Sequence, residues 1–81
     1  MNETFLAIVR GHLRFLPADV RLGPDSPLRD YGLDSMAAVS LVVDLEDEFG
    51  VQIPDSRLTA EALSTPGRLW QALQASSSAL R

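Results

Sequence analysis

Apolar residues recur at helical spacing in two segments of this 81-residue chain, and no other feature constrains its fold as strongly. In residues 2–16 and 35–49 they follow the i, i+3, i+4, i+7 pattern that lines one buried face of a helix. Pro17 stops the first pattern and Gly50 ends the second, as helix-terminating residues commonly do. The sequence therefore predicts an amphipathic helix over each segment.

The rest of the chain predicts a long loop and two further helices. Residues 17–34, punctuated by proline and glycine, join the first two helices. A short third helix is expected over residues 56–62, and "STPGRLWQAL" opens a fourth, with Thr65 as its cap and Pro66 in its first position. Because no stretch alternates as a strand would, we expect an all-α fold. We expect this fold to be a small four-helix bundle with a long loop between helices 1 and 2 and a short helix 3.

The length allows one domain, which we place at residues 1–75, followed by a flexible, low-complexity tail at residues 76–81. A chain of this size buries a modest core and is marginally stable. Helical spacing predicts the members of that core, which are Phe5, Val9, Leu13, Val42, Leu45, Phe49, Ile53, Leu58 and Leu69.

Negative charge is concentrated in the middle of the chain. The net charge is −4, and residues 25–64 hold nine acids against two arginines. Nucleic acid would need the opposite sign, so we expect either a basic protein partner or acids that only keep the domain soluble. No apolar run approaches the roughly 20 residues that a bilayer requires. The lack of cysteine, and of a basic segment ahead of "MNETF", fits a cytoplasmic protein without disulfides.

The stretch "GLDSM", residues 32–36, places Ser35 at the predicted start of the second helix. As a helix cap, either Asp34 or Ser35 would suffice. As a nucleophile, Ser35 would need a base, and the chain offers only His12, without a G-x-S-x-G elbow. As an attachment point, a serine hydroxyl at a helix N-terminus lies where a phosphate is favoured. We therefore expect no enzyme and no metal site.

The second predicted helix carries an additional apolar strip, Met36, Val39 and Val43, away from its core stripe. Capping does not explain this strip. Nor does capping explain the acids at residues 46–48, which oppose the helix dipole in the last turn. In so small a domain, a helix that is apolar on two sides is expected to touch a partner.

These segments resemble the acyl carrier proteins and the thiolation domains of polyketide and nonribosomal peptide synthases. The match lies in Gly32, Leu33, Asp34, Ser35 and Met36 and continues through "LVVDLEDEFGVQIPD" and "TPGRL", so it covers most of the chain. The resemblance implies a small four-helix bundle in which Ser35 carries covalent 4′-phosphopantetheine from coenzyme A. It also implies that Asp34 helps a phosphopantetheinyl transferase to bind.

The same resemblance implies further partners for a monomeric carrier. They are an acyl- or aminoacyl-loading enzyme and downstream synthase or tailoring enzymes, which act on cargo held as a thioester. Their docking face would consist of Met36, Val39, Val43, Asp44, Asp47 and Glu48. Fatty acid synthase carriers commonly have acids where this chain has Ala37, Ala38 and Ser40, so we expect a polyketide or nonribosomal peptide pathway. The alternative is an unmodified acidic helical module for protein interaction.

Overall fold

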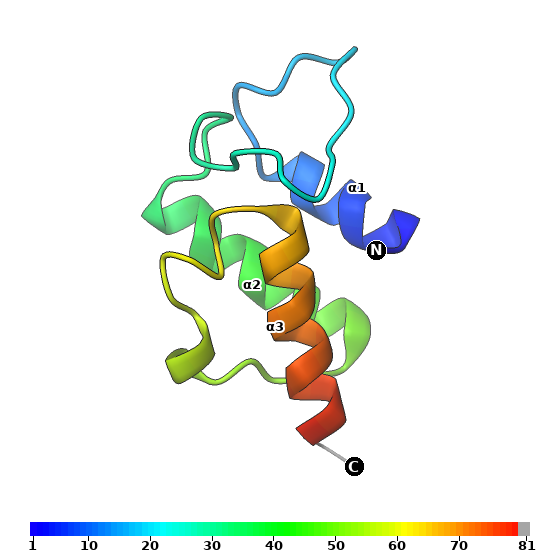
Figure 1. Ribbon diagram of the computed structural model, residues 1–81, viewed down its shortest axis with the longest axis vertical. Coiled ribbons are helices and arrows are strands. Elements are labelled where there is room, and N and C mark those ends of the chain that lie inside the picture. The colour runs from blue at the N-terminus through cyan, green and yellow to red at the C-terminus, as the bar shows by residue number, and fades with distance from the viewer. Residues whose placement is uncertain (80–81) are drawn as a thin grey trace.

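The computed structural model describes residues 1–79, with side chains through Ser76, and all regular structure in that part is helical. The elements in chain order are α1 (Glu3–Gly11), α2 (Ser35–Phe49), the 3₁₀ turn η1 (Asp55–Arg57) and α3 (Pro66–Ala79). Figure 1 shows the long α1–α2 loop at one end of the molecule and the segment with η1 running along one side. The predicted all-α fold is confirmed.

Helix α1 starts as its sequence predicts but ends five residues early, at Gly11 instead of Leu16. Asn2 caps its N-terminus, where the side-chain Oδ1 accepts a hydrogen bond of 2.7 Å from the Phe5 backbone N–H. Beyond Gly11 the Phe15 N–H donates to the Tyr31 carbonyl at 2.9 Å. Before that contact, the His12 and Leu13 N–H groups donate to the carbonyls three residues back, those of Val9 and Arg10, so the α-helical pattern has already ended although the apolar spacing continues.

The long loop is attached to the helices by buried side chains and backbone hydrogen bonds. Leu28 and Leu33 of this loop are buried. The Leu28 N–H donates to the Ser64 carbonyl, and the Gly67 N–H donates to the Pro24 carbonyl at 2.9 Å. A Cβ on Gly67 would lie 2.9 Å from that carbonyl oxygen, so only glycine permits this close approach.

The predicted third helix, residues 56–62, is wrong in its extent, because only η1 forms there. Leu58 has φ −93° and ψ 61°, which takes the backbone out of helical conformation. Thr59 then begins a separate turn, in which its hydroxyl accepts a hydrogen bond of 3.1 Å from the Ala62 N–H. The segment is therefore two short turns, and the bundle has three α-helices among its described residues.

The core lies between the three α-helices and the long loop. Seven of the nine predicted members are buried, whereas Phe49 and Leu58 are half-buried at its edge. Trp70 of α3 packs its ring edge-on against Phe5, at a centroid distance of 4.9 Å, and against Phe49 at 6.2 Å. Further buried apolar residues are Leu28, Leu33, Ala38, Leu41, Val51 and Leu73.

Helix α3 continues past the predicted domain end at residue 75. It runs to Ala79, and Ser76 is buried, with its hydroxyl donating to the Ala72 carbonyl at 2.9 Å. Of the predicted tail, residues 80 and 81 lie outside the described residues, so the domain boundary stays a prediction. Within residues 1–79, no helix combines the length and the apolarity needed to cross a bilayer.

Candidate functional site

Ser35 occupies the first position of α2, and the preceding residue does the capping. The Asp34 carboxylate oxygen Oδ1 accepts a hydrogen bond of 2.8 Å from the Ala37 N–H, and the Asp34 carbonyl accepts one of 2.9 Å from the Ala38 N–H. Ser35 is exposed, and its hydroxyl hydrogen bonds to no group among the described residues. The sequence left the choice of cap open, and the structure assigns it to Asp34. The Ser35 hydroxyl is therefore free for another role.

The one histidine of the chain is paired with an acid of α2. His12 lies just beyond α1, where its Nε2 is 2.6 Å from the Asp44 carboxylate oxygen Oδ2. Asp44 lies nine positions after Ser35, which at about 1.5 Å per residue is roughly 13 Å along the helix axis. The part of the chain that the structure describes also contains no group of three acidic, histidine or cysteine side chains that could hold a metal ion. The His12 imidazole is thus paired with Asp44 in the middle of α2 and not with the Ser35 hydroxyl.

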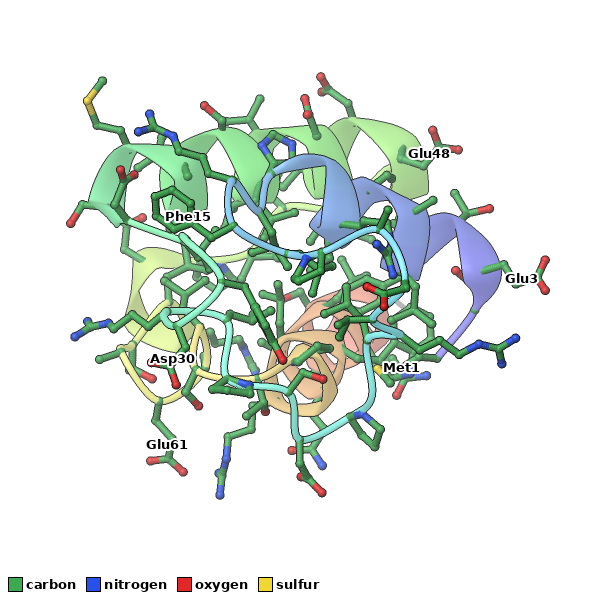
Figure 2. The ribbon with its side chains drawn as sticks, turned by 90° about the horizontal axis from the view of Figure 1, so that it is seen from above. Met1, Glu3, Phe15, Asp30, Glu48 and Glu61 are labelled. Carbon is green, nitrogen blue, oxygen red and sulfur yellow. The ribbon has the colours of Figure 1, made fainter. Side chains whose placement is uncertain are left out.

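The predicted additional strip of α2 is at the surface. Met36 is 82% exposed, Val39 65% and Val43 48%. Asp47 and Glu48 are exposed beyond it, and Figure 2 shows Glu48 pointing outward near the far end of α2. Single exposed apolar residues are common. Three of them spaced at i, i+3 and i+7, however, lie on the same side of a helix and form a continuous surface.

Two of the acids near this strip have partners within the chain. Asp44, predicted for the docking face, is paired with His12 and so also joins α1 to α2. Glu46 uses its side-chain Oε2 to accept a hydrogen bond of 2.7 Å from the Ile53 N–H, in the loop that follows α2. The acid at residue 46 therefore stabilises the loop, a role that helix spacing alone did not reveal.

Ser35 lies between two surface pockets. One, of about 520 Å³, is lined by Ser35 together with Arg14, Phe15 and Arg29 from the loop side. The other, of about 410 Å³, is mainly apolar, and Val39, Val43 and Leu58 are among its lining residues. Sequence reasoning missed the first pocket, because the loop residues that line it carry no helical pattern and are distant from Ser35 in the chain.

Comparison with known proteins matches most of the chain to a family. Residues 3–73 match the family described as "Phosphopantetheine attachment site". An acyl carrier protein homolog from Ureaplasma parvum serovar 3 is 45% identical over 31 residues, which make up 38% of this chain and 40% of that protein. The alignment with this relative thus spans less than half of either chain.

Proposed function

Because this chain belongs to the family of phosphopantetheine attachment-site domains, we propose that Ser35 is the residue that carries its covalent 4′-phosphopantetheine. The family match agrees with the resemblance read from "GLDSM" and with the all-helical fold. Domains of this family are carriers and not catalysts, so the chain is not an enzyme. When bound, the group supplies a thiol that holds an acyl or aminoacyl cargo as a thioester.

The residues at the start of α2 fit the group. Ser35 has an exposed hydroxyl that makes no hydrogen bond with the described residues, and this is the observation that carries the proposal. The Asp34 carboxylate accepts the hydrogen bond from the Ala37 N–H, so Ser35 is not needed as a cap. The backbone N–H groups of a first helical turn lack partners within the helix and favour a phosphate nearby. The pockets on both sides leave room around the hydroxyl.

We assign partner binding to the exposed strip of α2 and to the acids beyond it. Met36, Val39 and Val43 offer apolar contact on the same helix that Ser35 opens. Asp47 and Glu48 are exposed and would attract a basic surface, first of all that of the transferase. Asp44 contributes less, because His12 already pairs with it. We place these encounters in the cytoplasm, with the carrier as a monomer.

We further propose that the cargo belongs to polyketide or nonribosomal peptide biosynthesis. The support is the first part of α2, where Ala37, Ala38 and Ser40 stand in place of the acids common in fatty acid synthase carriers. The mass of the protein isolated from its own cells, before and after thioester cleavage by neutral hydroxylamine, tests this pathway. A polyketide-like or aminoacyl mass released on cleavage supports it, and a simple saturated fatty acyl mass contradicts it.

Incubation with coenzyme A and a broad-range phosphopantetheinyl transferase tests the carrier role itself. The carrier proposal expects the intact mass to rise by one phosphopantetheine group. An unmodified interaction module with the same acidic helix would show no gain, since it has no use for the Ser35 hydroxyl.

A further inference from the structure

The larger pocket beside Ser35 has a cationic lining. Its volume of about 520 Å³ falls in the range of roughly 300–1,000 Å³ that is typical of small-molecule sites. Arg14 and Arg29 line it together with Asp34 and Ser35, and the exposed ring of Phe15 adds an apolar wall. A positive pocket is unexpected in a chain whose net charge is −4.

The two arginines of this pocket have no other ionic role within the part of the chain whose side chains are described. The Arg10 guanidinium donates to a carbonyl of the long loop, and Arg68 pairs with Glu61. Arg14 and Arg29 are exposed, and their guanidinium groups make no hydrogen bond or ion pair with the described residues. Both are therefore available to an anion in the pocket.

The backbone holds the Arg14 side of the pocket against the segment that leads into α2. The Phe15 N–H donates to the Tyr31 carbonyl at 2.9 Å. A Cβ on Gly32 would lie 3.0 Å from the Phe15 ring and 3.1 Å from the Arg14 backbone nitrogen, and Gly32 has φ +98°. Glycine is thus needed at this position because a Cβ would lie too close to Phe15 and Arg14 and because its φ is positive. Figure 2 shows Phe15 over the start of α2.

We infer that Arg14 and Arg29 bind the phosphodiester of the arm on Ser35, so that the first part of the arm lies in this pocket against Phe15. The inference rests on the proposed function and adds two residues that would hold the group. A phosphodiester brings one negative charge next to the carboxylate of Asp34, and the two guanidinium groups balance both charges. Guanidinium groups pair well with phosphate oxygens because their N–H donors match them two at a time.

The experiment compares three holo proteins after reaction with coenzyme A and a transferase. They are the wild type, Arg14→Gln/Arg29→Gln, and the control Arg21→Gln/Arg57→Gln, which removes equal charge from exposed arginines outside the pocket. Intact mass is checked first. Absence of a mass gain in the wild type would overturn the proposed function and this inference with it, whereas a normal gain leaves the arginine contacts to be judged by spectroscopy.

Nuclear magnetic resonance then observes both partners of the proposed contact, the arginine side chains and the phosphate. In the wild type, the side-chain Nε–H signals of Arg14 and Arg29 should shift on modification, and those of Arg21 and Arg57 should not. The ³¹P signal of the pocket variant should differ from that of the wild type and the control. This difference should disappear near 1 M salt, where the screening length falls to about 3 Å.

Two results would overturn the inference while leaving the carrier role intact. One is arginine signals in the wild type that do not change on modification, which requires no variant. The other is a single ³¹P position shared by all three proteins at low salt, with backbone amide spectra showing that each protein is folded.

Discussion

The imidazole of His12 and the carboxylate of Asp44 lie 2.6 Å apart and join the end of α1 to the middle of α2. The His12 side chain is 19% exposed and that of Asp44 56%, so the pair lies at the edge of the domain and not in its core. One of the acids expected to meet a partner is thus partly used within the fold.

Asp44→Asn should lower the free energy of unfolding only slightly, by about 0–1 kcal/mol, because side-chain pairs at the surface contribute little. Urea unfolding at neutral pH measures the change. Asp47→Asn is the control, since Asp47 is exposed and has no pairing in the described structure. If Asp44→Asn slows the transferase as much as Asp47→Asn does, then the His12 pairing does not reduce the availability of Asp44.

The two residues at the start of α2 should respond differently to truncation. Asp34→Ala removes the hydrogen bond to the Ala37 N–H and should cost about 0.5–2 kcal/mol of stability. Ser35→Ala should cost little, because its hydroxyl caps nothing. Thermal unfolding of both variants, with Asp34→Asn as a control that retains a capping oxygen, checks this order. A larger loss in Ser35→Ala than in Asp34→Ala would show that Ser35 supports the helix start.

Substitution of Leu45 is the clearest test of which residues form the core. Its side chain is fully buried, so Leu45→Ala should cost about 2–5 kcal/mol, a large fraction of the stability of so small a domain. Met36→Ala on the same helix is the control, because Met36 is 82% exposed and should change stability little. Denaturation midpoints that coincide for the two variants would contradict the assigned orientation of α2.

The exposed strip should be needed for partners and not for folding. Val43→Asp should slow modification by the transferase without unfolding the domain, because Val43 is 48% exposed and contributes apolar contact. Gln74→Asp adds the same charge at an exposed position on a different helix, α3, and serves as the control. If Val43→Asp unfolds, Val43 belongs to the core. If the transferase modifies the two variants at equal rates, the strip is not part of the docking face.

The salt dependence of association should distinguish the contribution of the acids from that of the apolar strip. Raising salt should slow association of the transferase with the wild type more than with Asp47→Asn/Glu48→Gln, because exposed charges are screened within about 8 Å at physiological ionic strength. Stopped-flow association rates over a salt series give both slopes. Equal slopes would mean that Asp47 and Glu48 only hydrate the surface.

Local patterns in the sequence predict α2 well. The residues that define it are close in sequence: Asp34 and Gly50 at its ends, Leu45 on its buried face and the strip that includes Val43 on its exposed face. Its helical spacing therefore separates the buried face from the exposed one before any tertiary contact is known, although Phe49 at its end is only half-buried. The choice between Asp34 and Ser35 as its cap, in contrast, needed the structure.

Contacts between distant segments could not be predicted in this way. Helix α1 ends at Gly11, and a hydrogen bond from Phe15 to Tyr31 attaches the chain beyond it to a distant segment, whereas apolar spacing alone continued that helix. The arginines beside Ser35 reach it only because the long loop folds back toward α2. The break at Leu58 likewise follows from backbone conformation, since the residues of the expected third helix have no strong helix-breaking pattern.

The central claim is that Ser35 is the attachment residue, and intact mass spectrometry of two matched variants tests it most directly. Ser40 is an exposed serine on the same helix, so Ser35→Ala and Ser40→Ala remove the same hydroxyl group from neighbouring turns. After coenzyme A and transferase treatment, the wild type and Ser40→Ala should each gain one phosphopantetheine, and Ser35→Ala should gain none. A folded Ser35→Ala protein that still acquires the group would contradict the assignment.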